Sequence, residues 1–381
     1  MRERMTIGTK PGLYTTDRYN GSRQIHVAPE EVVEDQNALE TVHTVAQLTL
    51  PDGQIIEVHE WNPKNSENIN PVPVVIASGW MTSGYPYAAL ARGISAGQLL
   101  RKAPHTETVS PQVDPQAEFH AEPKEEESAN MRHDRTGGRR VIAFNAPVGI
   151  EATHLQKEMG KRIPYPELRK IALLDAVFSG KKIEQADIVG HSEGAFYTAL
   201  YGVERSEAVR SVVLLDPLGI TTAEDDDTKK RSFTAQLMHS AVSRARLAFK
   251  YNAELLGDIP RGFSNGQLPQ ALRAVFKEAL TNVVKHPVLA WESIGVMHNA
   301  DIRTHIKLLQ QKGHHVGVIV AHDEGLFPGD EIREKLKKSG VLPDRFATVS
   351  GRHNDALATS DGQDMVGHML NQLAHDTNKK Q

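Results

Sequence analysis

The sequence contains no cysteine among its 381 residues. Disulfides, thiol nucleophiles and cysteine-ligated metal sites are therefore excluded, whereas either redox compartment remains open. No apolar run approaches the ~18 residues that a membrane-spanning helix needs. The first 20 residues also contain no apolar stretch of signal-peptide length. We therefore expect a cytoplasmic protein without a membrane span.

The sequence also has little net charge, with a formal value of −4 at pH 7. It thus lacks the excess of positive charge that attracts nucleic acid or an anionic membrane. Hydrophobic residues make up 39% and charged residues 24%, which is typical of a soluble globular protein with a sizeable core. The length suits one large domain with an insertion, or two domains. We expect a small-molecule partner and no nucleic acid, and the oligomeric state stays open.

The first part of the chain combines an arm, a hairpin and a buried strand. Residues 1–40 are polar and weakly patterned, and we expect them to form an N-terminal arm over the domain. HTVAQLTL, PDGQ and IIEVHEW (43–61) follow, and the Asp-Gly pair suits a tight turn between two strands. The continuous apolar run PVVIASG (73–79) is typical of a strand covered on both faces. A helical pattern then spans 87–102.

Residues 103–139 interrupt this order. They are rich in Pro, Glu and His and contain few large apolar groups. Such a segment buries too little apolar surface to offset its chain entropy, so we expect a surface insertion. Its acidic run EPKEEES is interpreted as a solvated stretch.

Strands and helices alternate after the insertion. This order predicts an α/β fold with a doubly wound, mostly parallel sheet and right-handed crossovers. The expected strands are 140–147, 186–190, 211–217, 315–325 and 345–351. The expected helices are 164–180, 193–205, 330–340 and 361–375.

A long helical stretch separates two groups of strands. Residues 221–310 contain no convincing strand, and 232–256, 268–286 and 301–313 have helical spacing. We interpret 221–310 as an inserted helical cap whose last helix rejoins the core. The core would then consist of 41–220, with the insertion, and 311–381.

The pentapeptide GHSEG (190–194) stands between an apolar strand and an apolar helix. In this context Ser192 is expected on a tight, strained turn with its hydroxyl projecting from the sheet edge, and Gly190 and Gly194 give room for neighbouring elements. The helix amino terminus favours developing negative charge. Ser192 is thus a candidate nucleophile. The alternative is an ordinary turn whose serine only caps the helix.

A serine nucleophile needs a base, and His353 is the candidate among 18 histidines. It stands in VSGRHND, after the last expected strand and before a helix. His191 is expected to point away from the catalytic face and to serve packing or local polar contacts. His314 and His315 are interpreted as surface residues, and His322 as a local hydrogen-bonding group.

Three carboxylates are candidates for the acid that orients the base. Asp323 and Glu324 end the strand in VIVAHDEGLFP, and Asp216 ends the strand in VVLLDPLG. Asp216 is better explained as a turn residue before Pro217. Residue patterns alone do not decide between the adjacent Asp323 and Glu324.

Acyl transfer also needs two backbone N–H groups directed at the developing oxyanion. One is expected from Glu193, the residue after the nucleophile. The other is expected from Trp80, in the loop ASGWMTSGY, where Gly79 lets the chain turn. The sequence implies no cofactor and no metal.

Taken in order, SGW, GHSEG, HDEGLFP and GRHND resemble the α/β-hydrolase fold superfamily, over about 41–381 without the insertion. In that family the acid loop usually has the pattern G-x-x-D-x-x-x-P. The resemblance therefore implies Glu324, four residues before Pro328, as the acid. The loop departs from the pattern, because Ala321 replaces Gly and Glu replaces Asp.

The resemblance implies an esterase-like serine hydrolase with a helical cap. The expected reaction is cleavage of a carboxylic ester through an acyl-enzyme, with Ser192, His353 and Glu324 as the triad. The same triad would also serve a lactone, a carbon–carbon bond or an acyl acceptor other than water. A binding protein of this fold that turns over little or nothing is a further alternative.

Overall fold

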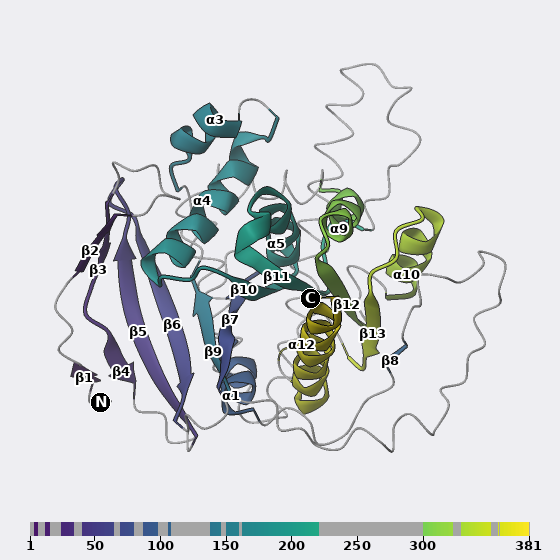
Figure 1. Ribbon diagram of the computed structural model, residues 1–381, viewed down its shortest axis with the longest axis horizontal. Helices are drawn as coiled ribbons and strands as arrows, with labels where there is room; N and C mark the ends of the chain where they lie inside the picture. The colour runs from purple at the N-terminus through teal and green to yellow at the C-terminus, as the bar shows by residue number, and fades with distance from the viewer. Residues whose placement is uncertain are drawn as a thin grey trace.

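The computed structural model of the protein shows one large mixed sheet with helices on both faces (Figure 1). The structure describes residues 4–6, 12–15, 24–33, 40–64, 69–79, 87–97, 106–107, 138–145, 150–159, 162–220, 300–322, 329–351, 357 and 359–380.

The centre of the sheet is a parallel block. The strands follow in the order β1-β4-β5-β6-β9-β7-β10-β11-β12-β13-β8, with β3 on β5 and β2 on β3. The pairings from β9 through β7, β10, β11 and β12 to β13 are all parallel. The bounds are β1 (Arg4–Thr6), β2 (Gly12–Thr15), β3 (Gln24–Val27), β4 (Glu31–Val33), β5 (Thr41–Thr49), β6 (Ile55–Pro63), β7 (Asn70–Ala77), β8 (Thr106–Glu107), β9 (Arg139–Phe144), β10 (Ala186–His191), β11 (Val209–Leu215), β12 (His315–Ala321) and β13 (Arg345–Val349).

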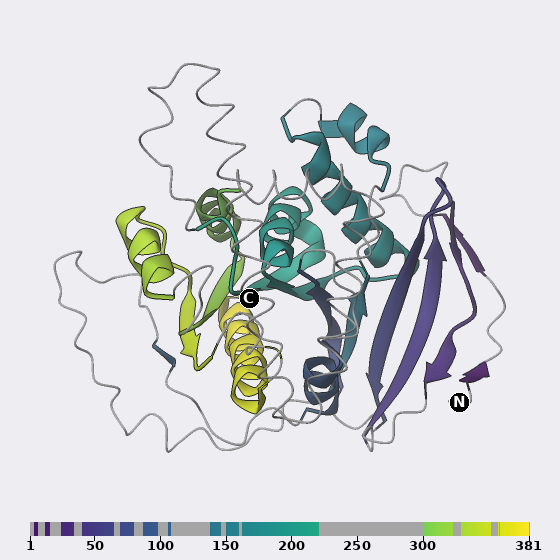
Figure 2. The same cartoon turned by 180° about the vertical axis from the view of Figure 1, so that it is seen from behind.

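Helices cover both faces of this block. Figures 1 and 2 show α3, α4, α5, α9 and α10 on one face and α1 and α12 on the other. Each face has its own buried apolar cluster, so the predicted doubly wound, mostly parallel sheet is confirmed. The bounds are α1 (Ala88–Ala96), α3 (Thr153–Met159), α4 (Tyr165–Gly180), α5 (Glu193–Glu204), α9 (Ile302–Gln311), α10 (Gly329–Lys338) and α12 (Ser360–Lys380).

The continuous apolar runs of the sequence form the central strands of the sheet. Every residue of β10 and of β12 is buried, because helices cover both of their faces. The predicted hairpin is also present: β5 and β6 pair antiparallel, and Gly53 closes their turn with φ +83°.

Helix α1 is shorter than the predicted span of 87–102. It ends at Ala96, because Gly97 adopts a left-handed conformation with φ +65° and its N–H donates to the carbonyls of Gly93 and Ile94. This is a common glycine helix end. Residues 98–102 lie outside the described residues.

The N-terminal segment and the insertion contribute strands that the sequence analysis did not predict. β3 and β4 both pair antiparallel with β5 and widen the sheet beyond the hairpin. Within the predicted insertion, β8 pairs antiparallel with β13, and Arg139 is already the first residue of β9. The rest of 103–137 lies outside the described residues.

The two ends of the predicted cap meet at the core. Residues 221–299, with most of the expected cap helices, lie outside the described residues. The Ile302 N–H donates to the Gly219 carbonyl at 3.2 Å, and Gly219 lies against Ala300. After this junction α9 packs on α5, where the last helix of the cap was expected to rejoin the core.

His314 and His315 differ from the expectation of surface residues. His315 opens β12, is only 4% exposed, and its Nδ1 lies 3.4 Å from Asp344 Oδ1. His314 is half-buried, and its Nε2 lies 2.7 Å from Ser206 Oγ. The residues that contact these two side chains are distant in the sequence, so a pattern of single residues does not reveal the contacts.

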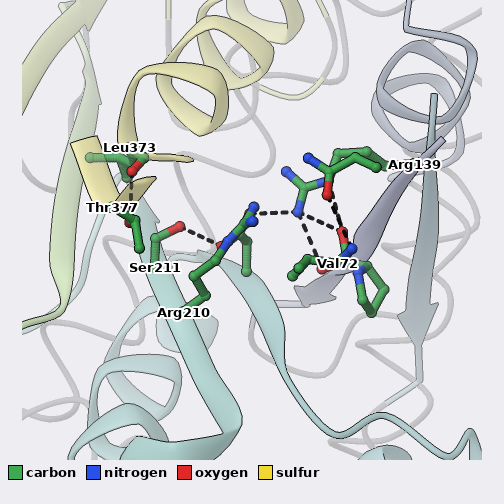
Figure 3. Close-up of polar contacts among 9 residues, drawn as sticks. Val72, Arg139, Arg210, Ser211, Leu373 and Thr377 are labelled. Carbon is green, nitrogen blue, oxygen red and sulfur yellow. Dashed lines mark hydrogen bonds and ion pairs between the residues drawn. The ribbon is translucent and has the colours of Figure 1, made fainter. Parts of the chain in front are cut away.

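A buried charge cluster joins the strands at the end of the sheet where β10 begins. Asp187, fully buried on β10, accepts hydrogen bonds from Arg139 on β9 and from Arg210 and Ser211 on β11. Arg139 and Arg210 reach toward each other in Figure 3. Burial raises the pKa of Asp187, but the two arginines and Ser211 outweigh it and lower the pKa. This cluster lies at the opposite end of β10 from Ser192.

Candidate active site

The turn from β10 into α5 holds Ser192 in a strained conformation. Its φ is +55° and its ψ −120°, outside the region that a serine normally adopts. The Ser192 N–H donates to the Leu215 carbonyl at 2.9 Å, and the Ser192 carbonyl accepts the Ala195 N–H at 3.1 Å. These bonds hold the strained backbone that GHSEG predicted for a nucleophile.

Gly190 and Gly194 are required by close backbone contacts. A Cβ at Gly190 would lie 2.6 Å from the Ala195 Cα, and a Cβ at Gly194 would lie 2.3 Å from the Ala77 carbonyl oxygen. Neither contact is sterically possible, and backbone atoms cannot rotate away as a side chain can. The two glycines thus let α5 and β7 approach the turn, as the motif predicted.

The Ser192 hydroxyl is buried but not engaged within the described part of the chain. The residue is 1% exposed, and its Oγ has no hydrogen-bond partner among the described residues. A buried hydroxyl usually has a partner. The expected partner, His353, lies outside the described residues.

The loop that follows β7 lies directly against the serine. A Cβ at Gly79 would be 3.3 Å from Ser192 Cβ. The Ser78 carbonyl accepts a hydrogen bond from Tyr197 Oη, and the Gly79 N–H donates one to Tyr87 Oη. Trp80, the predicted oxyanion donor, lies outside the described residues, but it follows Gly79 by one peptide bond.

Glu193 is a buried residue at the amino terminus of α5. It is the first residue of α5, where backbone N–H groups lack partners within the helix. Its side chain is 1% exposed, and its Oε1 lies 3.1 Å from Lys170 Nζ on α4. The helix N-terminus therefore stands directly after the nucleophile, as predicted.

His191 lies on the α1 side of the sheet. It is 4% exposed, and its Nδ1 lies 3.2 Å from Tyr87 Oη. The prediction of a packing or locally bonding role agrees with this contact.

Of the three acid candidates, only Asp216 is described. It is fully buried at the end of β11 with φ +40°, and its Oδ1 accepts the Ala321 N–H at 2.6 Å. This carboxylate therefore joins the ends of β11 and β12. Asp323 and Glu324, which follow β12, lie outside the described residues.

The strands that precede the predicted site residues end at one edge of the sheet. In the registers of the parallel strands, Ala77 pairs with Gly190, His191 with Leu215, and Leu215 with Ile319. The His322 N–H donates to the Val349 carbonyl at 2.8 Å, which joins the ends of β12 and β13. The loops after β7, β10, β12 and β13 thus start side by side, where ligands bind in open α/β sheets.

Sequence reasoning missed three residues beneath the site. Tyr87, Tyr197 and Lys170 contact the loop after β7 or the first turn of α5. Tyr197 stands four residues after Glu193, a spacing that places both on one helix face and was the only available signal. Nothing in the sequence pairs Tyr87 or Lys170 with the motif.

The described residues contain no group of three or more His, Asp or Glu side chains suited to a metal ion. Among the helices that the structure describes, none is both long and apolar enough to cross a membrane.

Comparison with known proteins finds similarity at the level of structure. No protein-family model matches the sequence, and no curated protein matches it. Bromoperoxidase from Bacillus anthracis has a TM-score of 0.50 and 14% identity, over 86% of this chain and 99% of that chain. A carboxylesterase structure from Nitrososphaera gargenis has a TM-score of 0.49 and 15% identity, over 87% of this chain and 99% of that chain. A thermophilic esterase from Thermogutta terrifontis has a TM-score of 0.45 and 13% identity, over 87% of this chain and 98% of that chain.

The likeness to the bromoperoxidase agrees with the mostly parallel sheet that helices cover on both faces. At such low identity it bears on the fold alone. The chain therefore has the α/β-hydrolase fold.

Proposed function

We propose that the protein is a serine hydrolase that cleaves carboxylic esters of small molecules. The observation that carries this proposal is the buried Ser192, held at φ +55° at the end of the central strand β10 with Gly79 beside it. Strain of this kind persists only where surrounding structure maintains it, and it concentrates at functional sites.

In the proposed reaction, His353 removes the proton from Ser192 as its oxygen attacks the ester carbonyl. Glu324 orients the imidazole and stabilises its charged form. The backbone N–H groups of Trp80 and Glu193 bind the oxyanion of the tetrahedral intermediate. His353 then gives the proton to the leaving alcohol, and water hydrolyses the acyl-enzyme by the same steps.

The spacing of the strands is compatible with this triad. β13 lies three strands from β10, which corresponds to about 14 Å. Four residue steps separate Val349 from His353, and an extended chain of that length spans up to about 14 Å. An extended course of these residues along the sheet edge therefore has the length to bring the imidazole to Ser192.

The first test is the substitution Ser192→Ala. It should reduce turnover of a short p-nitrophenyl ester to background, because no nucleophile remains, while the thermal unfolding midpoint stays close to that of the wild type. A fluorophosphonate probe should label the wild-type protein at Ser192 and leave the variant unlabelled. Ser179→Ala, which removes another buried hydroxyl on α4, serves as the control and should keep full activity.

Undiminished turnover by Ser192→Ala would reject the assignment. A wild-type protein that neither turns over esters nor reacts with the probe would favour a binding function. Labelling without ester turnover would direct the search to lactones, carbon–carbon bonds and acyl acceptors other than water.

A further inference from the structure

One peptide group beside Ser192 is held at both of its polar atoms. The Ser78 carbonyl accepts a hydrogen bond from Tyr197 Oη at 2.7 Å, and the Gly79 N–H donates to Tyr87 Oη at 3.0 Å. These are the two polar atoms of the Ser78–Gly79 peptide. Tyr197 belongs to α5 and Tyr87 directly precedes α1, helices on opposite faces of the sheet (Figure 1).

This peptide group lies against the nucleophile turn. A Cβ at Gly79 would be 3.3 Å from both Ser192 Cβ and the His191 carbonyl oxygen, and a Cβ at Gly194 would be 2.5 Å from the Ser78 oxygen. Because a peptide unit is planar and rigid, fixing both polar atoms fixes its plane. The next backbone N–H along the chain is that of Trp80.

The Tyr87 hydroxyl is itself oriented by His191. It accepts the Gly79 N–H, and its oxygen lies 3.2 Å from His191 Nδ1. A tyrosine hydroxyl has one proton to donate, so Tyr87 donates it to that nitrogen when Nδ1 is unprotonated. Both side chains are almost completely buried, at 1% and 4% exposure.

The Tyr197 ring lies beside an ion pair made by the first residue of α5. Lys170 Nζ lies 5.3 Å from the centre of the Tyr197 ring and 3.1 Å from Glu193 Oε1. Burial, with the nearby Glu193 and Tyr87, raises the pKa of Tyr197 well above its ordinary value. The phenol therefore keeps its proton and remains a donor to Ser78.

We propose that Tyr87 and Tyr197 are positioning residues for the oxyanion site, which clamp the Ser78–Gly79 peptide from the two faces of the sheet beside Ser192. This inference rests on the proposed hydrolase function. The clamp fixes the peptide from which the loop with Trp80 departs, and Tyr197 ties this peptide to α5, whose first residue is Glu193. The backbone that leads into the proposed oxyanion site is then held in place before substrate binds, as effective stabilisation of that charge requires.

The test compares Tyr87→Phe and Tyr197→Phe with the control Tyr201→Phe. Each change removes one buried phenolic oxygen, but the Tyr201 hydroxyl donates to Asp175 instead of the loop. We expect kcat for a p-nitrophenyl ester to fall about tenfold in each of the first two variants, with KM within about twofold, because misplaced donors weaken only the transition state. Tyr201→Phe should retain kcat.

A second readout separates positioning from stability. A trifluoromethyl ketone places an oxyanion in the same site when it adds to the serine, so its affinity should fall by the same factor as kcat/KM in the two clamp variants. Thermal midpoints of all three variants report any general loosening of the core.

The outcomes are distinguishable. Full kcat in the Tyr87 and Tyr197 variants of an active enzyme would overturn the clamp alone. The clamp would also be overturned if kcat and the thermal midpoint fell together, and by the same amount, in all three variants. A wild-type protein without ester turnover or probe labelling would overturn the proposed function and the clamp with it.

Discussion

At the scale of single residues, backbone strain is concentrated where strands end at the candidate site. Ser192 and Asp216 are two of the three described non-glycine residues with positive φ, and they follow the neighbouring strands β10 and β11. The Asp216 N–H donates to the Ile319 carbonyl at 2.8 Å, and its carboxylate accepts the Ala321 N–H. Asp216 therefore fastens the end of β12 from which the loop with Asp323 and Glu324 departs.

This role leads to a prediction about the triad acid. Glu324→Gln should lower kcat by about 10³–10⁴, because the amide cannot stabilise the charged imidazole of His353. Asp323→Asn and Asp216→Asn should lower kcat less than tenfold. In Asp216→Asn the amide oxygen still accepts the Ala321 N–H, so the loop keeps its anchor.

The measurement is ester turnover of the three variants, with thermal midpoints recorded in parallel. A loss in Asp216→Asn equal to that in Glu324→Gln, at an unchanged midpoint, would make Asp216 the acid and contradict the assignment to Glu324.

At the scale of elements, buried ion pairs fasten the antiparallel and parallel parts of the sheet to each other. Glu60 on β6 accepts hydrogen bonds from Arg140 on β9 at 2.8 and 3.0 Å, and its other ionic contact is Lys181 Nζ at 2.6 Å, directly after α4. Burial alone raises the pKa of Glu60, but Arg140 and Lys181 outweigh it and lower the pKa from 4.5 to about 2. The cluster joins two strands and a helix through one ionised carboxylate.

The lowered pKa predicts a pH dependence of stability. The folded state binds the Glu60 proton more weakly than the unfolded state, so its contribution is complete above pH ~4.5 and is lost as the pH falls toward about 2. The difference in pKa corresponds to about 3 kcal/mol of the free energy of unfolding. Glu60→Gln should be less stable at neutral pH and should show a flatter profile across this window.

Urea unfolding of both proteins from pH 7 to pH 2 measures the effect. Glu158→Gln, which removes a half-exposed carboxylate that pairs with Arg205, is the control and should retain the wild-type profile. If the free energy of unfolding fell with pH equally in the wild type and in Glu60→Gln, Glu60 would not be the source of the pH dependence.

At the scale of the whole molecule, the described residues on either side of 221–299 lie next to each other. The hydrogen bond between the Ile302 N–H and the Gly219 carbonyl joins the two ends. Beyond it, α9 buries Ile302, Ile306 and Leu309 on the core, and Leu309 lies against Gly202 of α5. The core is therefore continuous across this junction.

This junction predicts that the core folds without the intervening segment. Replacing residues 221–299 by a short Gly-Ser linker should leave cooperative unfolding, with a free energy of unfolding within about 3 kcal/mol of the full chain, because a short loop costs less closure entropy than a long one. Selectivity among esters should change if this segment forms the cap.

The matched control is deletion of 221–311, which also removes α9 and should prevent folding because the apolar face of α5 loses its cover. Circular dichroism and urea titration of both deletions provide the measurement. A linker variant that fails to fold would mean that 221–299 is part of the core.

The sequence by itself determined the local features of this protein. Apolar runs such as those of β10 and β12 predict strands buried on both faces, because burial on both faces requires apolar side chains at every position. The glycines of GHSEG predict the strained turn at Ser192, because only residues without Cβ allow the contacts at Gly190 and Gly194. The alternation of these elements predicted the fold.

Only the tertiary structure decided which residues of different elements meet. Examples are the pairing of β3 and β4 with β5, the burial of His315 beside Asp344, and the two tyrosines on the Ser78–Gly79 peptide. Strand pairing uses backbone groups that every residue carries, and a tyrosine hydroxyl bonds any carbonyl or N–H within reach. Such partners follow from the packing of the whole chain, so no local pattern specifies them.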